Sequence, residues 1–79
     1  MTRYAIAITF RSIMDGNLYT VYRGKDNRSL SNPIGELYPD KVRKYGYLKP
    51  SGAKKAYEWL TTSNEYNHKI EIVPLEVEG

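Results

Sequence analysis

One segment of the chain, residues 41–49, combines basic and aromatic side chains more densely than any other. Lysine and arginine neutralise phosphates, and a tyrosine ring offers a base a stacking face worth ~1–3 kcal/mol. The segment therefore has the chemistry of a surface that binds nucleic acid or another macromolecule. Alternating Lys and Tyr are also typical of a half-buried strand with tyrosines packed inward. The candidate binding residues, including two lysines that follow the segment, are Lys41, Arg43, Lys44, Tyr45, Tyr47, Lys49, Lys54 and Lys55.

The residue types needed for catalysis or metal binding are scarce. The chain has no cysteine and one histidine, His68, which we expect in a surface turn, so a Ser-His-Asp triad or a multi-histidine metal site lacks its parts. Carboxylate chemistry needs two acids converging in a cleft. Asp15 and Asp40 instead fall in turn-forming sequence, and no glycine spacing matches a phosphate-binding loop. We therefore expect a protein that is not an enzyme and that uses no cofactor or metal.

Tyrosine is unusually frequent, with eight in 79 residues. Its ring supplies a large contact area at low entropic cost, as at the hot spots of protein interfaces. Tyr4, Tyr19 and Tyr57 fit the core-facing pattern of their segments. The alternative to a binding role is that a small core uses tyrosine rings as filler, with their hydroxyls in water. The candidates for exposure are Tyr22, Tyr38, Tyr45, Tyr47 and Tyr66.

The net charge of +3 is unevenly distributed along the chain. In residues 1–57, Lys and Arg outnumber Asp and Glu eleven to four, whereas in residues 58–79 the acids outnumber the single lysine five to one. Such an asymmetry steers a polyanion toward one surface, although it also describes ordinary solvated charge.

The length of the chain allows a single domain, residues 1–79, with one modest core, because a chain this short buries only about 60% of its unfolded surface. Without disulfides its stability must come from packing and hydrogen bonds or from oligomerisation, so monomer and homodimer both stay open. The apolar run near the N-terminus is closed by Arg11, and no stretch approaches the ~20 apolar residues of a membrane span. We expect a soluble cytoplasmic protein that makes no membrane contact.

The first strand is expected near residues 3–12, where large apolar side chains alternate with a strict period of two. Ala5 and Ala7 begin its reverse face, and their small size lets another element approach closely. This pattern predicts a strand that is central in the sheet or covered at that end.

A hairpin is expected next, because Asp15-Gly16 is the pair that a two-residue type I′ turn requires. The second strand then lies near 18–24. This turn would pair Phe10 with Val21, and it would place Tyr19 and Val21 on the large apolar face of the first strand.

The rest of the chain predicts one helix and one more strand. Residues 51–63 carry apolar side chains at helical spacing behind Ser51, a plausible N-cap, and predict an amphipathic helix. Residues 69–77 alternate as a strand, with a bulge or an edge position expected at Pro74, where the register would shift by one. Residues 25–40 are mostly loop-forming, and a further strand at 34–38 or 42–48 would shorten that loop. The predicted fold class is α+β, a small antiparallel sheet packed on one helix.

Two resemblances concern function. The sequence Gly46-Tyr47-Leu48-Lys49-Pro50-Ser51-Gly52-Ala53 resembles an element of the arm-type DNA-binding domains of tyrosine recombinases. That resemblance implies a three-stranded sheet packed on this helix and inserted into the major groove. The sequence departs from the family at Lys49, where a threonine is usual, and it adds a C-terminal strand.

The overall format, a very short chain with a hairpin, one helix and no catalytic parts, resembles small phage-encoded proteins, including anti-CRISPR inhibitors. The leading hypothesis is a non-enzymatic inhibitor or adaptor that binds a host nucleic-acid-handling protein complex. The alternative is a small DNA- or RNA-binding module that uses the basic, tyrosine-rich surface.

Overall fold

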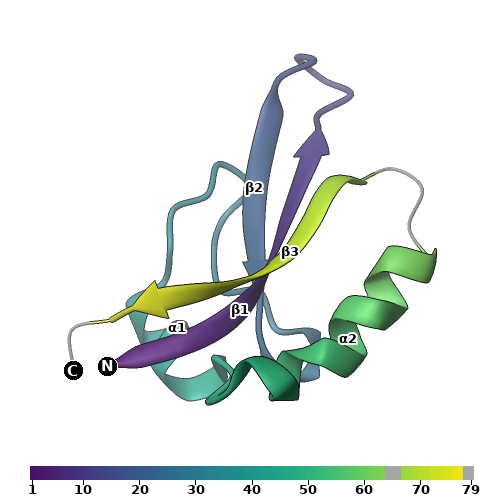
Figure 1. Cartoon of the computed structure of the whole chain (residues 1–79). Coiled ribbons are helices and arrows are strands. Elements are labelled where there is room, and N and C mark those ends of the chain that lie inside the picture. The colour runs from purple at the N-terminus through teal and green to yellow at the C-terminus, as the bar shows by residue number, and fades with distance from the viewer. Residues whose placement is uncertain (64–66, 78–79) are drawn as a thin grey trace.

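The computed structural model describes residues 1–63 and 67–77 of the chain (Figure 1). Three strands form an antiparallel sheet in the order β2-β1-β3, which confirms the predicted α+β class. Two helices and one short 3₁₀ turn accompany the sheet. In chain order the elements are β1 (Thr2–Arg11), β2 (Leu18–Arg23), η1 (Lys25–Asn27), α1 (Pro39–Tyr45), α2 (Pro50–Ser63) and β3 (Asn67–Glu76).

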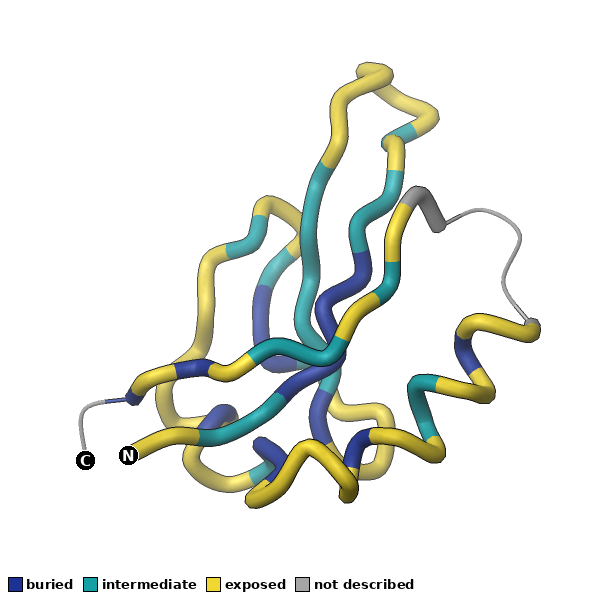
Figure 2. Tube along the Cα trace, viewed as in Figure 1, coloured by how far each residue is buried: buried dark blue, intermediate teal, exposed yellow. Residues whose placement is uncertain are grey.

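Strand β1 is central and is buried on both faces, as its alternation predicts. Ile6 and Ile8 pack toward α2 in one apolar cluster, together with buried Ala53 and Leu60. Ala5 faces the other way into a second cluster whose largest members are Leu30, Val42 and Leu75. Figure 2 shows the buried residues concentrated along β1, while the hairpin tip is exposed. The sheet is therefore covered by α2 on one side and by α1 and the preceding loop on the other.

The hairpin turn is longer than expected. Phe10 pairs with Tyr19, not with Val21, so the predicted register is wrong by two residues. The turn spans 12–17 and is closed by a bond from the Ser12 N–H to the Asn17 carbonyl of 2.9 Å. Because strand side chains alternate with a period of two, a shift of two leaves every side chain on its predicted face.

Side-chain hydrogen bonds order this turn. Asp15 accepts the Asn17 N–H at 2.9 Å and also the hydroxyl of Tyr19. These bonds favour the ionised carboxylate and lower the pKa of Asp15, the Tyr19 hydroxyl having the larger effect. Because the Asp15 carboxylate accepts these bonds, a wider loop is favoured over a two-residue turn.

Strand β3 pairs with β1 without interruption from Thr2–Glu76 to Thr9–Lys69, so the register shift expected at Pro74 is wrong. Pro74 lies opposite Tyr4, whose backbone N–H and C=O both bond to Tyr47 on the other side of β1. A proline fits here because this pair of the ladder needs no N–H from β3. Leu75 and Val77, which prompted the expectation, face the second cluster on the opposite side of the sheet.

The further strand expected at 34–38 or 42–48 does not form. Residues 39–45 are helix α1, with Pro39 in its first turn, where a proline loses no helical hydrogen bond. Arg43 and Lys44 occupy its last turn, where positive charge favours the helix dipole. Its one fully buried side chain, Val42, packs under the sheet. The Lys-Tyr alternation therefore belongs to a short helix and the extended residues after it.

Helix α2 begins one residue before the predicted start. Pro50 is its first residue, so Ser51 lies inside the helix and the predicted cap is wrong. Ala53 and Leu60 are buried as expected, whereas Trp59 is 62% exposed. No helix in the part of the chain that the structure describes is long and apolar enough to cross a membrane.

Two glycines allow the backbone to approach closely where α1 ends. A Cβ at Gly46 would lie 2.5 Å from the Val42 carbonyl oxygen, and one at Gly24 would lie 2.4 Å from the Tyr45 carbonyl oxygen. Neither contact can be relieved by a side-chain rotation, because both involve backbone atoms. Glycine is therefore required at both positions.

We predict that Gly46→Ala lowers the free energy of unfolding by about 1–3 kcal/mol, the usual cost of overpacking. Gly52→Ala is the matched control, because a Cβ there meets only the Tyr47 ring at 3.4 Å and alanine favours the helix by about 0.5–1 kcal/mol. Urea unfolding of the two variants measures both effects. Equal stability of Gly46→Ala and the wild type would contradict the packing described here.

Candidate binding surface

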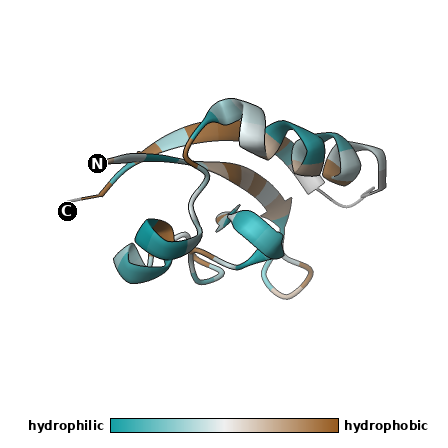
Figure 3. Cartoon of the chain, turned by 90° about the horizontal axis from the view of Figure 1, so that it is seen from below, coloured by the Kyte–Doolittle hydropathy of each residue, from teal (hydrophilic) through white to brown (hydrophobic). Residues whose placement is uncertain are grey.

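The basic residues of the candidate segment are all exposed, on two helices and their connection. Two cations from the η1 region, Lys25 and Arg28, join them. Viewed from below, α1 and η1 lie on one side of the sheet and are largely hydrophilic, whereas α2 lies on the other side (Figure 3). We name as the basic surface the following residues: Lys25, Arg28, Lys41, Arg43, Lys44, Lys49, Lys54 and Lys55.

Two tyrosines of this region are held beneath cations of the same surface. The Lys41 ammonium lies 4.8 Å from the centroid of the Tyr38 ring. Arg28 and Lys44 lie 5.2 and 5.3 Å from the centroid of Tyr45. Such contacts are attractive by ~0.5–1 kcal/mol at exposed sites. They favour orientations in which the cations cover the rings, and they occupy ring surface that a base would need for stacking.

Tyr47, the third aromatic residue of interest, is only 9% exposed and packs in the cluster beneath α2. Its backbone pairs with Tyr4 through bonds of 2.7 and 2.8 Å. The expectation of an exposed ring is therefore wrong for Tyr47. Tyr22 and Tyr45 are half-buried as well, and Tyr38 is 41% exposed. Tyr66 lies outside the described residues. Most of the tyrosines expected to be exposed are therefore at least half-buried, as the alternative role of core filler predicts.

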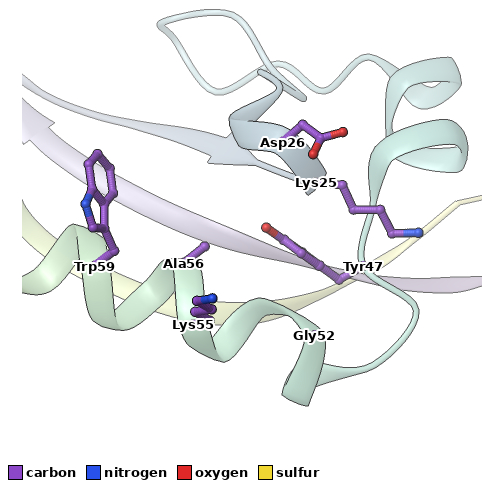
Figure 4. A pocket seen from close by; sticks show the side chains of 7 residues that line it. All are labelled: Lys25, Asp26, Tyr47, Gly52, Lys55, Ala56 and Trp59. Carbon is purple, nitrogen blue, oxygen red and sulfur yellow. The ribbon is translucent and has the colours of Figure 1, made fainter.

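An open groove of about 530 Å³ lies between η1 and α2. In Figure 4 the Tyr47 hydroxyl points from the floor toward η1, and the Trp59 ring stands up from α2 at one end. The groove combines cations, a carboxylate and aromatic surface. We name it the α2 groove, and its lining residues are Lys25, Asp26, Tyr47, Gly52, Lys55, Ala56 and Trp59.

The turn that forms one wall of this groove is strained. Asp26 and Asn27 both have φ of 56°, in the left-handed region that non-glycine residues rarely adopt. Hydrogen bonds from Gly24 N–H to the Arg28 carbonyl, 2.9 Å, and from Arg28 N–H to the Lys25 carbonyl, 3.1 Å, hold it. Strained backbone costs of order 1–3 kcal/mol per residue and concentrates at functional sites. This turn places Lys25 and Asp26 opposite α2.

Of the groove residues, Tyr47 and Lys55 are candidates from the sequence, and Trp59, Lys25 and Asp26 are additions from the structure. The last two precede α2 by about 25 residues, and only the chain reversal through α1 brings them to the helix. The periodicity of α2 places Trp59 at the edge of its apolar stripe, which is the sequence signal for this residue. No group of three or more His, Cys, Asp or Glu suited to a metal occurs in residues 1–63 and 67–77.

Burial raises the pKa of the Tyr47 hydroxyl, and the negative charge of Asp26 raises it further. The folded protein therefore holds this proton more tightly than the unfolded chain does. The resulting stability is complete below the ordinary tyrosine pKa of 10.0 and is lost as the pH rises through the higher folded value.

We predict that the wild type loses more unfolding free energy than Tyr47→Phe when the pH is raised from neutral to above 10.0. All other titrating groups are shared, so the difference between the two proteins isolates this hydroxyl. Urea denaturation at both pH values measures it. Equal losses would show that the hydroxyl is solvated like that of a free tyrosine.

Comparison with protein-family models, with curated proteins and with solved structures gives no match for this chain. The basic surface and the α2 groove are therefore the features of this chain that bear on its function.

Proposed function

We propose that this chain is a non-enzymatic binding protein, a phage-type inhibitor or adaptor that binds a host nucleic-acid-handling protein complex in the host cytoplasm. The observation that carries the proposal is the mixture of exposed cations and exposed apolar side chains around α2. Leu48 and Trp59 are 61% and 62% exposed beside the lysines of the basic surface. Aromatic anchors surrounded by a polar rim are typical of protein interfaces.

The state of the tyrosines favours a protein partner over direct base recognition. Binding of single-stranded nucleic acid relies on aromatic rings that are open to stacking. Here Tyr38 and Tyr45 lie under their own cations and Tyr47 is buried. A protein surface needs no such open faces, because it can meet the cations with carboxylates.

The short format without catalytic parts, which resembles phage-encoded inhibitors, supports the same proposal. Some such inhibitors imitate DNA with acidic surfaces. The net charge of +3 argues against that mode and favours docking on an acidic protein face.

We predict that the purified chain co-elutes with at least one host defence complex, a CRISPR effector complex being the first to test, on gel filtration. Lys49→Glu combined with Lys54→Glu should abolish co-elution, because both side chains belong to the basic surface. Lys69→Glu, in β3 and outside that surface, is the control for each of the two replacements made singly, with the same change of charge. Failure to co-elute with any candidate complex would count against the proposal.

A DNA- or RNA-binding module is the second candidate, favoured by one observation. On the basic surface the carboxylates are few, and Asp40 is neutralised by an ion pair with Arg43. The cations come from three separate elements, and each could neutralise a phosphate of a bound backbone.

For this candidate we predict that labelled duplex or single-stranded oligonucleotides bind at low salt and weaken steeply as salt rises. Each phosphate contact contributes a slope of about −0.9 in log–log form for duplex DNA. Replacing Lys54 by Glu should reduce the slope by about one contact, whereas Lys69→Glu should leave it unchanged. Absence of binding at low salt would eliminate this candidate.

A further inference from the structure

A second depression adjoins the α2 groove and shares Trp59 with it. It has a volume of about 430 Å³ and lies between α2 and the uncovered part of the sheet. The lining is mainly apolar. Its residues are Ile8, Phe10, Val21, Arg23, Asn27, Pro33, Trp59 and Leu60. The indole of Trp59 therefore stands where the two depressions meet.

The depression exists because α2 packs mainly on β3 and β1. Val21 of β2 and Phe10 at the far end of β1 share the α2-facing side of the sheet, yet both are only half-buried. The helix leaves them partly open, in line with its oblique course beneath the sheet in Figure 1. Apolar surface left open next to an exposed tryptophan is typical of a protein-binding site.

The charges around the two depressions select the chemistry of an occupant. Lys25 and Lys55 line the α2 groove together with a single carboxylate, Asp26, and Arg23 lines the apolar depression. An occupant that carries carboxylates beside large apolar side chains complements both parts. A nucleic acid does not, because its phosphates would run across an apolar floor that offers Arg23 alone.

We propose that the two depressions together bind a linear peptide segment of a protein partner, one that places a large apolar side chain over Phe10 and Leu60 and a carboxylate beside Lys55. The segment packs against Trp59, which anchors it at the junction. This inference rests on the proposed protein-binding function and specifies the part of the partner that is recognised.

The test begins with selection of a displayed library of random 12-residue peptides on the immobilised full chain. Enriched peptides should combine Asp or Glu with Leu, Ile, Phe or Trp. Synthetic peptides, measured by fluorescence anisotropy, should bind Trp59→Ala and Lys55→Glu at least about tenfold more weakly than the wild type, as expected for an anchor and its charged neighbour. Lys69→Glu should bind them unchanged.

Circular dichroism checks that each variant is folded, and Trp59→Phe provides a milder variant that should retain part of the affinity. The inference is overturned if no peptide is enriched, or if peptides bind Trp59→Ala as tightly as the wild type. Displacement of the peptide by a single-stranded oligonucleotide at moderate salt would instead identify the groove as a nucleic-acid site. Dimerisation on gel filtration that Trp59→Ala abolishes would identify a second copy of the chain as the occupant.

The two proposals can fail separately. If Trp59→Ala still co-elutes with a defence complex while peptides fail to bind, the proposed function stands and the groove is not its contact. If peptides bind but no complex co-elutes, the groove is a peptide site and the choice of partner is wrong.

Discussion

The backbone pairing of Tyr4 with Tyr47 is the constraint on which the rest of the structure depends. Strand β2 leaves β1 at Arg23, which pairs with Ile6, so without Tyr47 the polar backbone groups of Tyr4 would have no partner on that side. A buried unpaired N–H or C=O costs about 1–3 kcal/mol. Tyr47 meets this need, and in doing so it holds the connection between α1 and α2 against the sheet. The close backbone approaches at Gly24 and Gly46 follow from the same convergence.

This convergence also explains why a sequence rich in turn formers is ordered between β2 and α1. Ala5 and Ala7 leave room on the reverse face of β1, where Leu30 and Val42 are fully buried. Each such burial contributes roughly 1.5–3 kcal/mol. The loop is further tied down by the Leu30 N–H, which bonds to Tyr22 at 2.7 Å. The long connection thus acts as a second layer, which is how so short a chain covers both faces of its sheet.

The local periodicity of the sequence predicted the three strands of the sheet, the two faces of β1 and the apolar stripe of α2. It did not predict the hairpin register, because Asp15 forms side-chain bonds that favour a wider turn than Asp-Gly alone implies. Helix α1 was missed because a seven-residue helix with one buried side chain, Val42, has too few apolar positions to show a helical period. The register at Pro74 was predicted wrongly because it depends on the partner of the Tyr4 backbone hydrogen bonds. That partner, Tyr47, is set by the tertiary structure.

The candidate site likewise has features that the sequence predicts and features that it does not. Exposure of the lysines could be predicted from composition, since charged side chains stay in water unless they are paired. The role of the aromatic residues could not, because it depends on which rings the fold covers. Tyr45 lies beneath Arg28 and Lys44, and Tyr47 forms the floor of the α2 groove. Among the described aromatic residues Trp59 is the most exposed, and the proposed recognition surface therefore lies on the flank of α2, where apolar surface and positive charge meet.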